Sequence, residues 1–122
     1  MTCRNLRIKR VYQPLDAADG TRILVDRLWP RGLSRERAKI DLWLKEIAPS
    51  DTLRRRLHRD PSAWSHFKTA YYAELEEAPP QSALNVLIEQ LADGPVTLLY
   101  AARDETHNNA VALKEWLENR VG

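Results

Sequence analysis

The amino-acid sequence predicts an α/β fold in which a small, mainly parallel sheet is flanked by helices. Two observations carry this prediction. Short apolar segments typical of strands alternate with longer segments of helical periodicity, and the most apolar strands have the composition of strands covered on both faces. The 122 residues are expected to form one compact domain, residues 1–122, because no linker, repeat or low-complexity segment divides them.

The first half of the chain is expected to begin with two strands. Residues 6–12 alternate apolar and basic side chains, which predicts a strand with one solvated face. Residues 22–28 have a continuous apolar middle, which predicts a strand covered on both faces. Ser34 is a suitable N-cap for a helix at 35–47. The buried stripe of that helix is expected to consist of Ile40, Trp43, Leu44 and Ile47.

The second half is expected to be mostly helical. Its elements are predicted to be a short helix capped by Ser50, a helix at 61–77 begun by Asp60 and Pro61, a helix at 82–92 ended by Gly94, a strand at 96–101 and a helix at 107–120. Pro79 and Pro80 are expected to follow the end of the helix at 61–77. The helix at 82–92 has the clearest signal, since its leucine and isoleucine residues recur at helical spacing.

The composition excludes several classes of protein. A net charge of +2 does not by itself indicate a nucleic-acid partner, and the single cysteine, Cys3, cannot form an internal disulfide. No apolar stretch has membrane-spanning length and no signal-peptide segment is seen, which predicts a cytoplasmic protein without a membrane partner. The four glycines form no nucleotide-binding loop, and no two histidines stand at a metal-ligand spacing, so neither a cofactor nor a metal is expected.

The functional prediction rests on two polar connections that follow the apolar strands. Residues 26–32, DRLWPRG, close the first of these strands, and residues 102–110, ARDETHNNA, follow the second. In open α/β sheets ligands bind outside the carboxyl ends of the strands, so both connections are expected to share one rim. The predicted site residues at this rim are Asp26, Arg27, Trp29, Arg31, Asp104, Asn108 and Asn109, with Tyr72 reaching it from a helix.

The predicted ligand of this rim is a small anion, such as a phosphate or a nucleotide-like molecule. Arg27 and Arg31 would hold the anion through paired, charge-assisted hydrogen bonds. The N–H groups at the start of the last helix, near Asn108 and Asn109, would add anion affinity.

The acidic and aromatic residues of the rim have two interpretations. Asp26 and Asp104 would orient the arginines or move protons, which makes them the catalytic candidates if a reaction follows binding. Trp29 or Tyr72 would form a wall of the pocket. In the alternative interpretation, Asp–Arg pairs only tie the loops together and Trp29 is part of the core.

Two further functions are compatible with the sequence. A nucleic-acid-binding module could use the Arg-rich helical segment that contains Arg54, Arg55, Arg56 and Arg59, together with the basic cluster at 35–39. Acidic residues are interspersed among these cations, as is typical of a solvated face of mixed charge. A structural or interaction protein is the third alternative.

The connection DRLWPRG is expected to be rigid. Pro30 fixes its own backbone and biases Trp29 away from helix, while Gly32 is able to take a positive φ before Ser34. We therefore expect Asp26 and at least one of its two arginines to be partly buried and hydrogen-bonded. Asp104, or the backbone beside it, is expected to belong to the same network.

Four separated motifs resemble one family. They are R-I-L-V-D-R-L-W-P-R-G, D-x-W-L-K-E-I-A-P-S-x-x-L-R, D-P-x-x-W-x-x-F-x-x-x-Y and L-L-Y-A-A-R-D-x-x-x-N-N-A. In this order they resemble domain of unknown function 488, in particular its YeaO-like branch, over residues 6–117. The resemblance implies a single-domain α/β fold in a cytoplasmic bacterial or archaeal protein, and it implies no activity.

One departure from related branches concerns the last strand and the final helix. Those branches read roughly Leu-Leu-Cys-x-Glu, followed by Cys-His-Arg. This chain has Tyr100 and Ala102 in the strand motif, and Asn108, Asn109 and Ala110 at the helix. Thiol or metal chemistry imagined for the cysteine-bearing branches therefore does not carry over.

Overall fold

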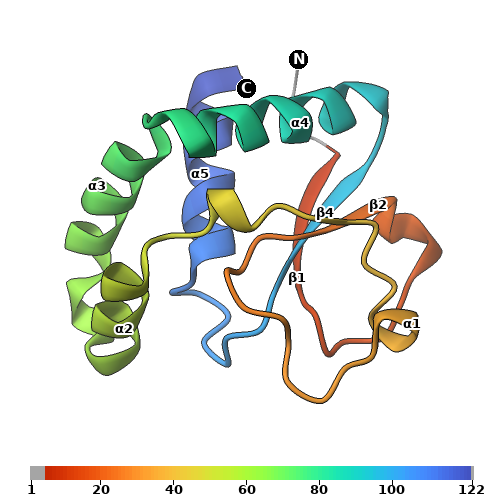
Figure 1. Ribbon diagram of the computed structural model, residues 1–122, viewed down its shortest axis with the longest axis horizontal. Coiled ribbons are helices and arrows are strands. Elements are labelled where there is room, and N and C mark those ends of the chain that lie inside the picture. Colours follow the sequence, from red (N-terminus) through yellow and green to blue (C-terminus); the bar gives the residue numbers. More distant parts are fainter. Residues whose placement is uncertain (1–4, 122) are drawn as a thin grey trace.

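Four parallel strands form one sheet in the order β1-β4-β2-β3, which confirms the predicted α/β fold (Figure 1). The computed structural model describes residues 5–121, so Cys3 lies outside the described residues. The strands are β1 (Leu6–Arg10), β2 (Thr21–Leu24), β3 (Leu42–Trp43) and β4 (Val96–Tyr100). The α-helices are α1 (Arg35–Ala38), α2 (Asp51–Arg59), α3 (Trp64–Leu75), α4 (Ala78–Asp93) and α5 (Asn109–Val121).

Strand β4 lies in the middle of the sheet between β1 and β2. Leu98 of β4 is in register with Ile8 on one side and with Ile23 on the other. Every residue of β4 is buried, as expected for a central parallel strand. The two predicted apolar strands are therefore parallel neighbours, which brings their carboxyl ends together.

The main hydrophobic core lies between one face of the sheet and the helices. Strand residues such as Ile23, Val96 and Leu98 pack there against apolar residues of α2, α3, α4 and α5. Figure 1 shows α3, α4 and α5 grouped to one side of the strands. Tyr71 and Leu87 are fully buried in this core, in agreement with the helical periodicity of their segments.

The opposite face of the sheet has a smaller core. Val11, Leu24 and Leu99 are buried there beneath half-buried side chains from the segments around β3, namely Trp29, Leu33, Ile40 and Trp43. Its cover consists of the short helix α1, the 3-10 turn Ala17–Asp19 and connecting loops. This face therefore lacks the long helices that cover the other one.

Several predicted boundaries are confirmed. Ser50 accepts a hydrogen bond from the Leu53 amide at the start of α2, and Asp60 accepts one from Ser62 with Pro61 at the first helical position. The turn Pro61–Ala63 continues into α3, and α4 ends at Gly94 as predicted.

The predicted helix at 35–47 is wrong. Helix α1 ends after one turn because Lys39 adopts a left-handed conformation, with φ of 50°. The chain then enters β3 and a 3-10 turn at Lys45–Ile47. Ile40 and Trp43 pack on the smaller core whereas Leu44 and Ile47 pack in the main core, so the apolar residues divide between two faces instead of forming one stripe.

Other boundaries differ by a few residues. The strand predicted at 22–28 ends at Leu24, and Leu28 is 63% exposed instead of covered. The helix predicted at 82–92 begins at Ala78, because Pro79 and Pro80 occupy its first turn, where a missing N–H costs nothing. Those prolines do follow the end of α3, as predicted.

Among residues 5–121, no helix is both long enough and apolar enough to cross a lipid bilayer.

Gly20 provides a test of the close approach between the residue just before β2 and Pro95, which lies just before β4. Its φ is +65°, and a Cβ added there would collide with the backbone carbonyl of Pro95, which accepts a hydrogen bond from Thr21. We expect Gly20→Ala to lower the free energy of unfolding by about 2–4 kcal/mol, since backbone strain and a backbone clash combine. Gly32 also has a positive φ, +77°, but open space around it, so Gly32→Ala should cost only about 1–2 kcal/mol. Equal losses in urea denaturation would contradict this account.

Candidate functional site

The two polar connections meet at one rim of the sheet, as predicted. Asp26 follows β2, and its Oδ2 accepts a hydrogen bond of 2.9 Å from the amide of Ala101, which follows β4. Its Oδ1 accepts a hydrogen bond of 3.0 Å from Nδ2 of Asn109, the first residue of α5. The same Nδ2 donates to the carbonyl of Val25 at 2.9 Å. Asp26 and Asn109 therefore join β2, β4 and α5.

The environment of Asp26 makes its carboxyl group harder to ionise. Burial is the largest influence on the pKa of Asp26 and raises it above the ordinary value of 3.8. Hydrogen bonds from Ala101 and Asn109, together with the positive charge of Arg54, oppose the shift without cancelling it. Both oxygens of this carboxylate already accept hydrogen bonds from the protein. We refer to these two bonds, from Ala101 and Asn109, as the Asp26 tie, because they link β2, β4 and α5.

The two arginines predicted to hold an anion are both exposed, so the expectation that at least one of them is partly buried is wrong, although Arg27 is hydrogen-bonded as expected. Arg27 donates from Nη2 to the carbonyl of Ala48 at 3.2 Å and from Nε to the carbonyl of Pro49 at 3.4 Å. Arg31 is exposed, and its carbonyl accepts a hydrogen bond of 2.8 Å from the Tyr12 hydroxyl. The guanidinium of Arg27 thus fastens the segment before α2, and the two arginines do not form a fork.

The predicted orientation of these arginines by the acidic residues is not found. Within residues 5–121, no ion pair or hydrogen bond joins Asp26 or Asp104 to Arg27 or Arg31. The reason is geometric, because both oxygens of Asp26 face β4 and α5 while Arg27 extends toward the start of α2.

Asp104 stabilises a turn before α5. Its Oδ1 accepts hydrogen bonds of 2.9 Å from the amides of Thr106 and His107, and its Oδ2 lies 3.2 Å from Nδ1 of His107. The backbone hydrogen bonds lower the pKa of Asp104 to about 2. A carboxylate this acidic is a poor general base at neutral pH, where a pKa nearer the working pH is needed.

Asn108 is the N-cap of α5. It is almost completely buried; its Oδ1 accepts from the Val111 amide at 3.0 Å, and its Nδ2 donates to the Asp104 carbonyl at 2.9 Å. The backbone beside Asp104 is therefore hydrogen-bonded to the same helix start that holds Asp26, as the rigid-loop prediction expected. The side chains of both asparagines of the N-N-A motif are therefore engaged in hydrogen bonds within the fold.

Tyr72 is engaged with α5. Its hydroxyl donates to the Ala112 carbonyl at 3.0 Å, and burial followed by the nearby Glu115 carboxylate raises the pKa of Tyr72 to about 12. This contact holds α3 against α5.

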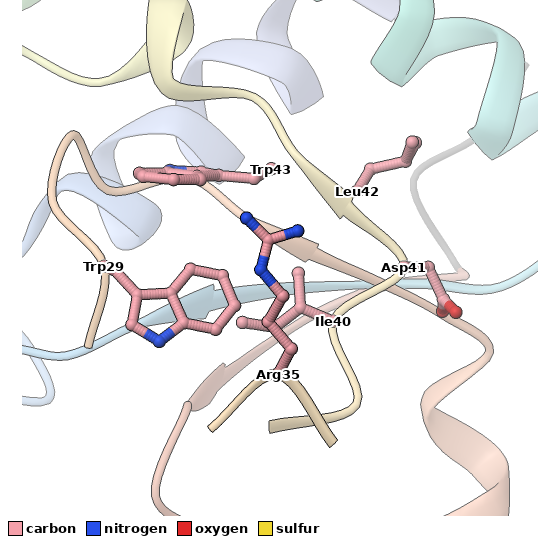
Figure 2. A pocket seen from close by; sticks show the side chains of 6 residues that line it. All are labelled: Trp29, Arg35, Ile40, Asp41, Leu42 and Trp43. Carbon is pink, nitrogen blue, oxygen red and sulfur yellow. The ribbon is translucent and has the colours of Figure 1, made fainter. Parts of the chain in front are cut away.

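A hollow of about 150 Å³ lies along the edge strand β3, between the loop that follows β2 and the segment that precedes β3 (Figure 2). Its walls are Trp29 and Trp43, whose ring centroids are 5.5 Å apart with planes inclined at 68°. The remaining lining residues are Arg35, Ile40, Asp41 and Leu42. Only Trp29 of the predicted site residues lines this hollow.

Both indole rings of the hollow are fixed by their N–H groups. Nε1 of Trp29 donates to the Leu33 carbonyl at 2.7 Å, and Nε1 of Trp43 donates to the Asp26 carbonyl at 2.7 Å. Each ring is only half buried, so part of its surface faces the hollow. The Asp26 tie therefore also positions one wall of the hollow.

Cations surround the two indole rings. The guanidinium carbon of Arg35 lies 5.7 Å from the Trp29 ring centroid, and Nζ of Lys45 lies 5.1 Å from that of Trp43. Figure 2 shows the guanidinium of Arg35 directed toward the two indole rings, and the carboxylate of Asp41 directed away. One oxygen of Asp41 accepts a hydrogen bond from the Arg22 amide.

Sequence reasoning missed Trp43 and Arg35 as residues of one hollow. It assigned Trp43 to the buried stripe of a helix and Arg35 to a basic cluster. The local signal for a strand was weak, because only Ile40, Asp41 and Leu42 alternate in polarity before Trp43.

The Arg-rich helix α2 is partly neutralised by its own residues. Arg54 and Arg55 both form ion pairs with Asp51, at 2.6 and 2.9 Å. Nη1 of Arg56 lies 3.2 Å from Nε2 of His66. In the part of the chain that the structure describes, no three His, Cys, Asp or Glu side chains gather in a way that could hold a metal ion.

Residues 5–122 match the model of a family described as the inactive DUF488-N3 subclade. The chain belongs to this family. Its relatives include the uncharacterized protein YeaO of Escherichia coli K12, 41% identical over 119 residues that cover 94% of this chain and 98% of that protein. The uncharacterized protein Rv3073c of Mycobacterium tuberculosis H37Rv is 34% identical over 115 residues, covering 94% of this chain and 95% of that protein. No solved structure matches the chain significantly.

These comparisons confirm the family that the four motifs indicated, including its YeaO-like character. The names of the relatives state no activity, so the interpretation of the site depends on geometry.

Asp26→Asn tests the tie at the rim. An asparagine side chain has one acceptor oxygen, so either the Ala101 amide or the Asn109 side chain loses its acceptor. If the side-chain amide of Asn109 rotated by 180° to avoid this, it would lose its hydrogen bond to the Val25 carbonyl. We expect the free energy of unfolding to fall by about 1–3 kcal/mol, the cost of a buried donor without a partner. Asp93→Asn, at an exposed position, is the matched control and should change it by less than about 0.5 kcal/mol. Equal effects in urea denaturation would show that the tie contributes nothing.

Asp104 predicts a pH dependence of stability. Its pKa of about 2 in the folded protein lies below the ordinary 3.8, so between these values the unfolded chain binds more protons. The contribution of Asp104 is therefore complete above 3.8 and is lost as the pH falls through the folded pKa of about 2. The stability difference between the wild type and Asp104→Ala should shrink over this interval in denaturation at a series of pH values. The difference between Asp104→Asn and Asp104→Ala, neither of which titrates at this position, should stay constant.

Proposed function

We propose that this protein is a non-catalytic binding protein for a small, planar anionic ligand of nucleotide-like chemistry. The ligand lies in the hollow of Trp29 and Trp43 at the carboxyl rim of the sheet, with Arg35 as its anion-binding residue. The carrying observation is that the guanidinium of Arg35 lines the same hollow as two fixed indole rings that contact each other edge to face.

The size and shape of the hollow favour a single flat group. Its volume of about 150 Å³ is below the roughly 300–1,000 Å³ of sites that enclose a whole drug-sized molecule. Two inclined indole rings offer stacking and edge contacts to a heteroaromatic ring. A ring bound here would leave the rest of its molecule outside, beside Arg35.

The charges around the hollow favour an anion over a cation. Aromatic rings by themselves attract cations, but Arg35 and Lys45 already lie against the two rings. A further cation would be repelled, whereas a phosphate attached to the stacked ring would accept charge-assisted hydrogen bonds from Arg35. The Asp41 carboxylate also lines the hollow, but it is directed away from the rings and accepts a hydrogen bond from the Arg22 amide.

Two observations support binding without catalysis. Both oxygens of Asp26 accept hydrogen bonds within the fold, and the pKa of Asp104 lies too low for a base at neutral pH. The family description, an inactive subclade, agrees with this interpretation.

Titration of tryptophan fluorescence with adenosine monophosphate, with adenosine and with inorganic phosphate tests the proposal. Because the ring and the anion both contribute, the monophosphate should bind more tightly than either fragment, and it should raise the melting temperature by mass action. Arg35→Ala should weaken binding of the monophosphate by about tenfold, since a hydrogen bond to a charged group contributes about 1.5–3 kcal/mol.

Arg37→Ala is the matched control for this experiment. Arg37 is exposed on the same short helix but does not line the hollow, so its loss should leave the affinity unchanged. Saturable binding that is lost equally in both variants would indicate a general charge effect. No fluorescence or melting response to adenosine monophosphate would overturn the proposal.

A further inference from the structure

We propose that the ligand is a single-stranded nucleic acid that lies along a row of three aromatic rings, Tyr12, Trp29 and Trp43, at the carboxyl edge of the sheet. This inference rests on the proposed function, because the hollow of Trp29 and Trp43 is where one unpaired base would be held. It extends that function from one planar group to a chain of them.

The three rings of this aromatic row come from successive connections of the sheet. Tyr12 follows β1, Trp29 follows β2 and Trp43 ends β3. The Tyr12 hydroxyl donates to the Arg31 carbonyl at 2.8 Å, which joins Tyr12 to the loop that carries Trp29. In the order β1-β4-β2-β3, the row extends across three strand spacings of about 4.8 Å, or about 14 Å. Because stacked bases lie about 3.4 Å apart, a row of this length spans several nucleotides.

Each ring of the row has a cation beside it. Arg10 lies 4.8 Å from the Tyr12 ring centroid, Arg35 lies 5.7 Å from that of Trp29 and Lys45 lies 5.1 Å from that of Trp43. Alternation of stacking rings with phosphate-binding cations is the arrangement that recognises single strands without a fixed sequence.

The exposure of apolar side chains near the aromatic row supports its use as a binding surface. Tyr12 is 40% exposed and Leu28, in the same loop as Trp29, is 63% exposed; both are among the few large apolar residues that the described part of the chain exposes. The exposed Arg31 is next to Tyr12, since its backbone carbonyl accepts a hydrogen bond from the Tyr12 hydroxyl. Apolar and cationic groups are thus interleaved along the row.

The aromatic row favours single strands over a duplex. The hollow of about 150 Å³ offers room for one flat group against the Trp29–Trp43 pair, whose rings contact each other edge to face, and a base in a duplex does not present its face to a protein.

The Arg-rich helix α2 is the competing surface for a nucleic acid. Its Arg54 and Arg55 are paired with Asp51, and no Phe, Tyr or Trp lies within its bounds. A duplex-binding or purely electrostatic mode would use that helix, so the two surfaces give opposite outcomes in one experiment.

The test measures fluorescence anisotropy of labelled single-stranded DNA and RNA of about ten nucleotides, with adenosine monophosphate and the matching duplex as competitors. The labelled single strand should bind at least about tenfold more tightly than adenosine monophosphate, and the duplex should compete poorly. Affinity should fall between about 50 and 200 mM salt, because phosphates release counterions.

Three variants separate the possible surfaces. Tyr12→Ala should weaken oligonucleotide binding by about fivefold or more, the loss of one stacked base, and leave monophosphate binding unchanged. Tyr12→Phe keeps the ring and removes only its hydrogen bond to Arg31, so it should bind as the wild type does. The double substitution of Arg54→Ala and Arg55→Ala on α2 should leave single-strand binding unchanged.

The outcomes are distinct. Monophosphate binding without any gain from a longer strand overturns this inference and leaves the proposed function intact. Loss of oligonucleotide binding in the α2 variant but not in Tyr12→Ala, or equal affinity for the duplex, also overturns it. Absence of binding to both the monophosphate and the oligonucleotide rejects the site altogether.

Discussion

The carboxylate of Asp26 is the interaction on which the rim of this protein depends. Parallel strands diverge where they end, and their last N–H groups must find acceptors other than the neighbouring strand. One oxygen of Asp26 accepts from Ala101 beyond β4, the other accepts from Asn109 at the start of α5, and its carbonyl accepts from the indole of Trp43 in β3. A single residue thus connects four elements of the fold. Because burial raises the pKa of this carboxyl group, its ionised form is maintained against a desolvation cost by the hydrogen bonds that it receives.

At the same rim, most polar side chains are used for hydrogen bonds within the fold, whereas the aromatic rings remain partly accessible to a ligand. The polar groups closest to β4 and α5 are engaged: Asn108 caps α5, and Asp104 holds the turn before it. The aromatic residues are also anchored, but only through their edges. Trp29 and Trp43 each donate the indole N–H to a backbone carbonyl, which fixes the ring, and a cation, Arg35 or Lys45, lies over each ring. Rings that are held this way keep their geometry before a ligand arrives, so little conformational entropy is lost on binding.

The sequence was sufficient to predict what depends on regular periodicity and on adjacent residues. The apolar run of β4, the helical spacing in α4 and the caps at Ser50, Asp60 and Gly94 all have local causes, and all were predicted. The shared rim followed from the parallel order of β2 and β4. The partner of Asp26 could not be chosen from sequence, because Asn109 lies 83 residues away and competes with nearer arginines that the geometry directs elsewhere. The contact of Tyr72 with Ala112 depends on how α3 meets α5, which is also a tertiary matter.

The early end of α1, which made the predicted helix at 35–47 wrong, is also the structural cause of the hollow. A parallel sheet usually has helices over both faces, and a helix through 35–47 would have covered the smaller core with its own apolar stripe. Lys39 instead turns left-handed after one helical turn, and the buried Arg22 donates to the carbonyls of Ala38 and Lys39 at that end. These hydrogen bonds give the terminal carbonyls of α1 a partner, so Arg22 stabilises the early stop. The chain then forms the edge strand β3 and places Trp43 in edge-to-face contact with Trp29, with the hollow beside the pair. The departure from a continuous helix is therefore the structural cause of the hollow.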